Sequence, residues 1–234
     1  MQHADNLGAI AGVEHGFCTI DDPQCPADVF IARQVHSASV IDWQAGLETN
    51  TVQADGVFTD EHQPIAVITA DCLPILIAAK NAEKVAAVHG GWKGLQGGII
   101  ANAVQRFADA GIAVDQLRVA IGPSIKPCCY EVSEAFIAQF PADQKHLWNV
   151  VQPAPLLTPQ IEPPHARQTA SAWFDLSAYG LSLLQAAGVS REQIEVSEVC
   201  TYCTSPAFAS YRRRTHNTQE AKTLIYSWIA RTQQ

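Results

Sequence analysis

Apolar residues form three short, continuous runs in the first half of the chain, and each run has the length of a β-strand. They are PIAVIT (64–69), LPILIAA (73–79) and KVAAVH (84–89). A half-exposed strand would alternate apolar with polar residues. These runs do not, so we expect them in one sheet that is covered on both faces. VFIARQVHSASVIDW (29–43) favours a strand around a polar centre, and LRVAIGPSI (117–125) a strand that runs into a turn.

Helical periodicity appears between these runs and after them. Apolar residues at a helical spacing occupy 97–111, and the pattern stops at Gly111. The later elements that we expect are a strand at IEVSEVC (194–200) and helices at Glu131 to Phe140, Ser171 to Ala187 and EAKTLIYSWIA (220–230). No internal repeat or domain linker is visible, so the pattern predicts a single α/β (α+β) domain over residues 1–234.

Composition and charge narrow the class of protein. With 234 residues, 47% of them apolar, the chain is large enough for one compact core. Its formal net charge of −8 disfavours nucleic acid or an anionic membrane as a partner, because such surfaces are usually bound by a basic stripe. No apolar run reaches the ~18 residues of a membrane span, and the first residues do not resemble a signal peptide. Nothing in the sequence indicates an oligomeric state.

Five prolines between Pro153 and Pro164 exclude regular structure there. The segment is expected to be a long surface loop or flap. Whether it closes over a site is left open by the sequence.

The seven cysteines indicate a reducing, cytoplasmic location, since a secreted disulfide scaffold would be shorter, denser in cysteine and usually even in number. Two pairs invite comparison with metal sites, the adjacent Cys128 and Cys129 and the C-x-x-C of Cys200 and Cys203. Adjacent cysteines do not easily reach one ion, and a single C-x-x-C without a second pair or a flanking histidine is weak evidence for zinc. The sequence therefore favours buried, inert thiols at both places.

An acid, a cysteine and a histidine stand where the buried runs end. Asp71 and Cys72 follow the first run, and His89 closes the third. The glycine-rich stretch GGWKGLQGG (90–98) comes next and leads into the expected helix. Such a turn can bind an anion through backbone N–H groups, with Lys93 adding a positive charge. It is neither a Walker A loop nor a dinucleotide fingerprint, so it does not by itself identify a nucleotide site.

His36, Cys72 and His89 together make a competent zinc ligand set. Two imidazoles and one thiolate leave a fourth position for water or substrate, and zinc held in this way lowers the pKa of its water toward ~7. The separations of 36 and 17 residues match no local zinc motif. An arbitrary histidine is more often a hydrogen-bonded surface or core residue, so both interpretations stay open on the residues alone.

Seven blocks connect these residues to a known family. In order, they are RQVHSASV, ADGVFTD, TADCLPILIA, AAVHGGWKG, IGPSIKPCCYEV, CTYC and SYRR. Together they resemble the bacterial family of laccase-like polyphenol oxidases, whose members are also described as purine nucleoside phosphorylases with adenosine deaminase activity and as peptidoglycan-editing factors. The resemblance covers Val29 to Trp228. It implies mixed sheets in layers covered by helices, and a zinc site at His36, Cys72 and His89.

The activity that the resemblance implies is phosphorolysis of adenosine, inosine, guanosine or methylthioadenosine, together with deamination of adenosine. The partners would be a purine nucleoside and inorganic phosphate, and the cofactor zinc, with copper as the alternative metal. Phosphate ligands are expected among Arg33, Lys93, Arg212 and the backbone N–H groups of Gly90 and Gly91, because Arg offers a bidentate fork and Lys a point charge.

Asp71, Cys72 and His89 are the candidate catalytic residues. Deamination requires a carboxylate that carries a proton, and Asp71 is the candidate, with orientation of a ligand or capping of a turn as its alternative role. Asp55 lies in an Asp-Gly pair, which is a turn signature, so we expect it to form a turn.

The chain departs from the family pattern at three places. GFCTIDDPQCPADVF (16–30) stands where many members carry a longer region with an Arg-Gly-Gly turn, Lys93 replaces a common Arg, and RTHNTQEAKT (214–223) replaces a Gly-rich turn with a second Arg. The expected metal ligands are intact, whereas the altered segments affect the expected substrate contacts.

Three other functions remain open. A copper-dependent laccase usually needs several His-x-His sequences, and the eight histidines here form none. A Cys-His hydrolase acting on a small molecule or a cell-wall precursor would use Cys72 as nucleophile and His89 as base, without need of His36. A non-catalytic binding protein would leave the open metal site without a purpose.

Overall fold

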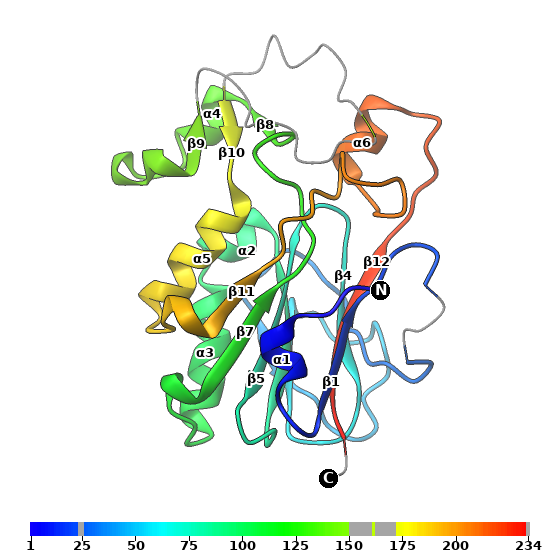
Figure 1. Ribbon diagram of the computed structural model, residues 1–234, viewed down its shortest axis with the longest axis vertical. Helices are drawn as coiled ribbons and strands as arrows, with labels where there is room; N and C mark the ends of the chain where they lie inside the picture. Colours follow the sequence, from blue (N-terminus) through cyan, green and yellow to red (C-terminus); the bar gives the residue numbers. More distant parts are fainter. Residues whose placement is uncertain (23–25, 150–160, 162–171, 233–234) are drawn as a thin grey trace.

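The computed structural model of the chain describes residues 1–22, 26–149, 161 and 172–232 (Figure 1). Of the flap expected between Pro153 and Pro164, Ile161 is described and the other residues lie outside these ranges. No helix within the described ranges has the length and apolar character needed to cross a membrane.

A six-stranded mixed sheet forms the centre of the fold. Its order is β11 (Ile194–Val196), β7 (Leu117–Ile121), β5 (Leu73–Ala79), β6 (Val85–Gly90), β3 (Gly56–Thr59) and β2 (Val40–Asp42). β5 runs antiparallel to both of its neighbours, whereas β2 with β3 and β7 with β11 are parallel pairs. Every residue of β5 and β6 is buried, as their continuous apolar runs predict.

A second sheet covers one face of the central sheet, and helices cover the other (Figure 1). The antiparallel second sheet has the order β1 (Val13–Phe17), β12 (Ile225–Arg231) and β4 (Ile65–Thr69), and the helices are α3 (Ile99–Asp109) and α5 (Leu176–Ala186). Strand β5 supplies both cores: Ile75 and Ile77 pack on the helix side, and Leu76 and Ala78 pack between the sheets. The predicted fold of mixed sheets in layers covered by helices is confirmed.

A small antiparallel sheet lies at one end of the molecule, beside α6 in the view of Figure 1. Its strands are β8 (Glu131–Val132), β10 (Ala172–Phe174) and β9 (Trp148–Asn149), with β10 in the middle. Short helical segments complete the described chain: α1 (Asp5–Gly8), α2 (Trp92–Gln96), α4 (Glu134–Ile137), α6 (Tyr211–His216) and the 3-10 turns Val114–Gln116, Ala142–Leu147 and Arg191–Gln193.

The closing helix predicted at 220–230 is wrong, because Ile225–Arg231 forms strand β12. This strand lies between β1 and β4 and pairs with both. Its residues include Ile225, Tyr226 and Trp228, and β-branched and aromatic residues suit a central strand. Strand pairing at this position therefore decides the conformation.

Three other predictions need adjustment. The strand expected at 29–43 is confined to β2, with isolated bridges before it. The helix expected at Glu131 to Phe140 is split into β8 and the single turn α4. The helix expected from Ser171 begins only at Leu176, because the Asp175 side chain caps it by accepting the N–H of Ala178.

Candidate metal centre

Three side chains converge at the end of the central sheet where β5 begins and β6 ends. Cys72 lies in the turn between β4 and β5, His89 lies in β6, and His36 comes from the loop before β2. One ligand atom from each residue lies within 4.8 Å of the other two. His36 Nε2 is 4.0 Å from Cys72 Sγ, and the two imidazole rings are 4.8 Å apart at 82°. The fold thus brings together the three residues predicted to bind metal.

The spacing of these atoms suits a tetrahedral ion. Zinc–nitrogen bonds of ~2.0–2.1 Å and a zinc–sulfur bond of ~2.3 Å place a nitrogen and a sulfur ligand about 3.5 Å apart. The observed 4.0 Å between His36 Nε2 and Cys72 Sγ therefore requires only a small closing movement. One thiolate and two imidazoles fit zinc and copper alike, so the donor set could hold either transition metal.

Asp55 orients two of the three ligands. Its Oδ1 accepts a hydrogen bond from His89 Nδ1 at 2.8 Å, which leaves His89 Nε2 as the ligand atom. The same carboxylate accepts the backbone N–H groups of Val35, His36 and Ser37 at 3.1, 2.9 and 2.6 Å. Asp55 lies at a bend directly before β3, and in addition its buried side chain organises the loop that carries His36.

Electrostatics at the centre favour an ionised thiol. Burial opposes ionisation of Cys72, but the imidazoles of His36 and His89 outweigh it and lower the pKa of the thiol to about 7. Burial likewise opposes protonation of His89, yet Asp55 and Cys72 outweigh it and raise the pKa of the imidazole to about 9. For Asp55, burial is outweighed by its hydrogen bonds, first of all with His89, so the pKa of this carboxyl lies well below its usual value.

Two of the four described non-glycine residues with a positive φ angle lie at the centre. His36 and Asp71 have φ angles of 60° and 87°, in the left-handed region, where Asp and His are more frequent than most other residues with a side chain. Such conformations cost about 1–3 kcal/mol each and persist where the surroundings fix them. Gly91 provides the space, because a Cβ there would lie 2.7 Å from His36 Cδ2 and 3.5 Å from Cys72 Sγ.

Hydrogen bonds from three donors engage both carboxylate oxygens of Asp71. Thr201 Oγ1 donates to Oδ1 at 2.6 Å, while Ser210 Oγ and the Arg212 N–H donate to Oδ2 at 3.0 and 2.7 Å. Burial raises the pKa of this carboxyl despite these bonds. These contacts hold the turn that carries Cys72, which fits the orienting role considered for Asp71. Proton transfer by Asp71 stays a prediction.

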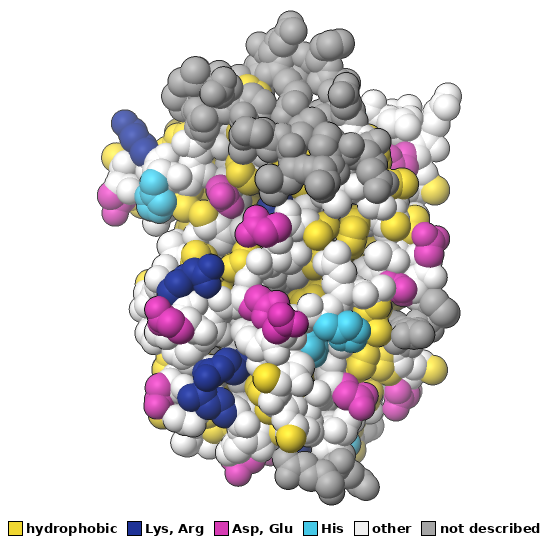
Figure 2. Space-filling model, in the orientation of Figure 1, with side chains coloured by type: hydrophobic (Ala, Val, Ile, Leu, Met, Phe, Trp, Pro, Cys, Tyr) yellow, Lys and Arg dark blue, Asp and Glu magenta, His cyan; other side chains and the backbone are white. Residues whose placement is uncertain are grey.

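The three ligands face a pocket of about 900 Å³, a size typical of small-molecule sites. Among the described residues that line it, basic side chains outnumber carboxylates. The one carboxylate is Asp71, and the basic residues are Arg33, Lys93, Arg212, Arg214 and Lys222. The positive charge is local, because the whole chain carries a net charge of −8. On the face shown in Figure 2, by contrast, the described acidic and basic side chains are interspersed over uncharged surface.

The side chains predicted to bind phosphate differ in their exposure and in the contacts that they already make. Arg33 and Lys93 are exposed at the pocket. Arg212 is already engaged, since its guanidinium lies 2.8 Å from the Glu131 carboxylate and 5.3 Å from the centre of the Tyr130 ring. Arg33 and Lys93 are therefore the predicted side chains most available to an incoming anion.

The glycine-rich stretch is divided between the end of β6 and two helices, and anion binding by the backbone of Gly90 and Gly91 stays a prediction. Helix α2 begins at Trp92, directly after Gly91, and α3 follows only at Ile99. Gly90 pairs with Leu73 inside the sheet, and neither Gly90 nor Gly91 lines the pocket. A Cβ on Gly90 would lie 2.9 Å from Leu73 Cβ, so close packing explains this glycine.

Among the described pocket residues that the sequence did not reveal are three aromatic and two basic ones: Trp92, Tyr130, Tyr211, Arg214 and Lys222. All five lie in or beside the blocks GGWKG, CCYEV and SYRR or in the segment after SYRR. Their position in or beside blocks that carry candidate site residues was the signal that could have identified these aromatic and basic residues.

A family model described as "Multi-copper polyphenol oxidoreductase laccase" matches residues 15–227. The chain belongs to this laccase family. One relative, "Adenosine deaminase RL5" from an unknown prokaryotic organism, is 31% identical over 214 residues, which cover 85% of this chain and 75% of the relative. "Purine nucleoside phosphorylase YfiH" of Escherichia coli K12 is 31% identical over 185 residues, 77% of this chain and 66% of the relative.

"Purine nucleoside phosphorylase YlmD" of Geobacillus stearothermophilus is 36% identical over 163 residues, 68% of this chain. The match spans about half of that relative, 54% of its length. The crystal structure of YlmD from the same organism superposes with a TM-score of 0.78 at 24% identity, covering 98% of this chain and 94% of that one. The Neisseria meningitidis protein NMB0706 gives a TM-score of 0.69 at 25% identity over 88% and 75% of the two chains.

Names within the laccase family point to different chemistries. The family description refers to copper oxidation, whereas these relatives are named for purine nucleosides. In this member of the laccase family, the described residues form two groups that could hold a metal ion, and only the group of His36, Cys72 and His89 contains histidine.

Proposed function

We propose that the chain is a zinc-dependent purine nucleoside phosphorylase that accepts adenosine, inosine, guanosine and methylthioadenosine and also deaminates adenosine. The observation that carries this proposal is a three-ligand centre facing a basic pocket with aromatic walls. The relatives named purine nucleoside phosphorylase and adenosine deaminase support the two reactions and the purine nucleoside class of substrate.

His36, Cys72 and His89 would hold the ion. Three protein ligands leave one coordination position open, and zinc bound in this way supplies a Lewis acid and a hydroxide at neutral pH. Asp55 fixes the tautomer of His89 and the backbone of His36, so it acts as a positioning residue.

Phosphorolysis requires that inorganic phosphate attack the anomeric carbon while the glycosidic bond to the purine breaks. Arg33 and Lys93 bind the phosphate and concentrate it at the pocket, because their charges are exposed there. Arg212 contributes through a guanidinium that Glu131 and Tyr130 already orient.

The purine base requires a flat apolar surface. Trp92, Tyr130 and Tyr211 line the pocket, and their rings can stack on the base. Burial raises the pKa of Tyr130, so this phenol stays protonated at neutral pH and can donate a hydrogen bond to a ring nitrogen of the departing purine.

A Cys-His hydrolase is the second candidate, and one arrangement favours it. Asp55, His89 and Cys72 stand in the order of orienting group, base and nucleophile, and the pKa of Cys72 is lowered to about 7. A hydrolase of this kind does not require His36. A copper-dependent oxidase is the third candidate, favoured by the family description.

One experiment separates these functions. The protein, purified without a metal-affinity step, is analysed for zinc and copper and then incubated with adenosine, inosine and methylthioadenosine, with and without phosphate. The proposal expects phosphate-dependent release of free base and phosphate-independent formation of inosine from adenosine. His36→Ala should abolish both reactions together with metal binding at this centre. Substantial activity in metal-free His36→Ala would favour the hydrolase, and oxidation of phenols without nucleoside turnover would favour the oxidase.

A further inference from the structure

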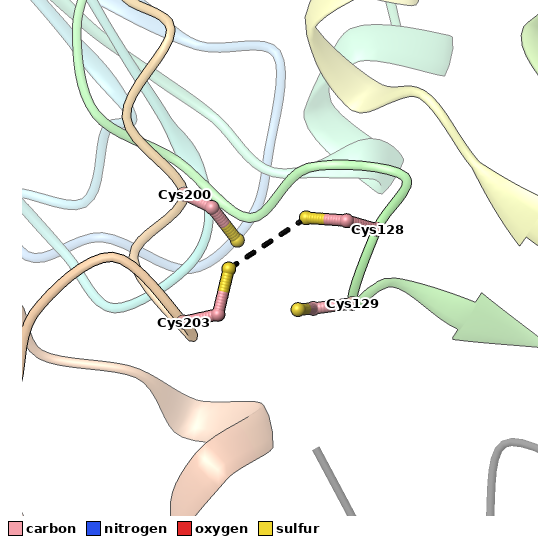
Figure 3. Close-up of side chains that lie close together, drawn as sticks. All are labelled: Cys128, Cys129, Cys200 and Cys203. Atoms are coloured by element: carbon pink, nitrogen blue, oxygen red, sulfur yellow. Dashed lines mark hydrogen bonds between the residues drawn. The ribbon is translucent and has the colours of Figure 1, made fainter. Parts of the chain in front are cut away.

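Four cysteine sulfurs meet outside the pocket, although the sequence places them in two distant pairs. The cysteine cluster consists of Cys128, Cys129, Cys200 and Cys203, and its sulfur atoms all lie within 4.8 Å of one another. Figure 3 shows the side chains of one pair pointing toward those of the other, from two separate segments of the chain. All four thiols are buried, as expected, but the two pairs also meet, which neither pair indicated in the sequence.

Two tight turns aim the sulfurs at one point. The N–H groups of Cys129 and Tyr130 both donate to the Lys126 carbonyl, at 2.9 and 3.0 Å, so the chain curls back where the adjacent pair occurs. This turn lets both neighbours face the same side, as Figure 3 shows, which an extended backbone would prevent. In the second segment, the Thr204 N–H donates to the Cys200 carbonyl at 3.1 Å, which closes a turn around the C-x-x-C pair.

The sulfur spacing matches a four-thiolate zinc site. Zinc–sulfur bonds of ~2.3 Å in a tetrahedron place the sulfurs about 3.8 Å apart. The Sγ atoms of Cys128 and Cys203 are 3.8 Å apart. A disulfide between these two would require ~2.05 Å. An iron–sulfur cluster would need wider spacing, because its cysteines bind different iron atoms.

Burial and charge at the cysteine cluster also suit an ion. All four cysteines are buried, with at most 3% of any one exposed. Four thiolates around one Zn²⁺ carry a net charge of −2, which needs compensation in a protein interior. Two buried cations lie in or beside the two turns, although the Arg213 guanidinium already pairs with the Glu220 carboxylate at 2.8 Å. Lys126 lies two residues before the adjacent pair, and the Arg213 guanidinium donates to the carbonyls of Thr201 and Tyr202 at 2.8 and 2.9 Å, within the second turn.

We propose that Cys128, Cys129, Cys200 and Cys203 bind one zinc ion in a closed, structural site. Binding releases the thiol protons to solvent and involves no oxidation or reduction. All four positions of the tetrahedron are filled by protein, so the site has no place for substrate. Its role is to fasten the turn at 126–130 to the turn at 200–204.

The two turns that the zinc ion would join also contact the pocket. Tyr130 directly follows the adjacent pair and lines the pocket, and Thr201 lies inside the C-x-x-C pair and donates to Asp71 at 2.6 Å. Asp71 immediately precedes the ligand Cys72. The structural zinc therefore positions one wall of the pocket and supports the turn that carries Cys72.

Zinc counting tests the proposal independently of nucleoside turnover. The wild-type protein, purified under reducing conditions without a metal-affinity step, should contain two zinc ions per chain. The double variant His36→Ala/Cys72→Ser should retain one, and cobalt in that variant should give the intense visible absorption of a tetrahedral thiolate site. Cys200→Ser/Cys203→Ser should lose the ion of the cysteine cluster, whereas the control Cys18→Ser, which alters a buried cysteine elsewhere, should keep both.

A folded His36→Ala/Cys72→Ser variant without zinc would overturn the proposal. A mass showing a disulfide within the cysteine cluster of the reduced wild-type protein would overturn it as well. If Cys200→Ser/Cys203→Ser fails to fold, the zinc content of His36→Ala/Cys72→Ser still decides. His36→Ala/Cys72→Ser lacks two of the three candidate ligands at the pocket, so the zinc that it retains tests only the cysteine cluster. Failure of the proposed phosphorolysis would be detected separately, in the activity of the wild type.

Discussion

Asp55 Oδ1 lies 2.8 Å from His89 Nδ1, and the same carboxylate holds the backbone of His36. Two ligands that are far apart in the sequence therefore depend on one buried acid. The register of the sheet creates this contact, because Gly56 of β3 lies opposite Val88 of β6 and brings their neighbours together.

Asp55→Asn should weaken metal binding. Whichever way the amide is turned, its NH2 group meets hydrogen-bond donors from the 35–37 backbone or from His89. Loss of a group that orients a ligand typically reduces metal affinity about 10- to 100-fold. Competition with a chelating dye measures this. Asp60→Asn is the matched control, since Asp60 pairs at the surface with Lys84 and should leave the affinity unchanged. Equal affinities for Asp55→Asn and the wild type would contradict the assigned role.

Gly91→Ala should displace His36. The new Cβ would lie 2.7 Å from His36 Cδ2, closer than real Cβ contacts, so the imidazole must move. We expect roughly a 10-fold or greater loss of zinc affinity, by the same reasoning as for other displaced ligands. Gly8→Ala is the control, because a Cβ there meets only one atom, at 4.0 Å. A crystal structure of Gly91→Ala with His36 in place and zinc fully bound would refute this.

Zinc affinity should rise with pH. Binding needs the thiolate of Cys72 and the neutral imidazole of His89, and in the metal-free chain their pKa values are about 7 and about 9. Between these values Cys72 is already ionised and His89 must lose a proton, so affinity should increase about 10-fold per pH unit. Below pH 7 the slope should steepen, and above pH 9 it should level off. Calorimetric titration in buffers of different ionisation enthalpy counts the released protons. Zinc binding near pH 8 without proton release would contradict the assigned protonation states of Cys72 and His89.

Lys93→Ala should raise the KM for phosphate about 10-fold at low salt, because an exposed cation of the pocket is lost. The zinc content and the thermal midpoint should not change, since the Lys93 ammonium contacts only the neighbouring Trp92 ring among the interactions described for it. Lys80→Ala removes an equally exposed lysine away from the pocket and should leave the KM unchanged. An unaltered KM in Lys93→Ala would remove Lys93 from the phosphate site.

The buried strands and the convergence of the three candidate metal ligands could be predicted because their signals are local or carried by recognisable blocks. Continuous apolar runs identify β5 and β6 as buried on both faces, and Cys72 and His89 stand at their ends. His36 needed the resemblance, since no spacing rule connects it to the other two ligands.

Long-range contacts account for what could not be predicted. The role of Asp55 depends on the pairing of β3 with β6, and β12 is a strand because it lies between β1 and β4. The cysteine cluster joins two segments, and Cys128 and Cys203 are 75 residues apart in the sequence. Neither pair of cysteines alone indicates this contact. In each case the deciding partner is remote in the sequence.

The proposed function requires that one metal centre serve phosphorolysis of purine nucleosides. The most direct measurement is the release of free base from adenosine and inosine by zinc-loaded protein, with and without phosphate, in the wild type and in Cys72→Ala. We expect phosphate-dependent release in the wild type, and loss of this activity together with one zinc ion in Cys72→Ala. Intact nucleosides after incubation of the zinc-loaded wild type, or full activity in Cys72→Ala, would contradict it.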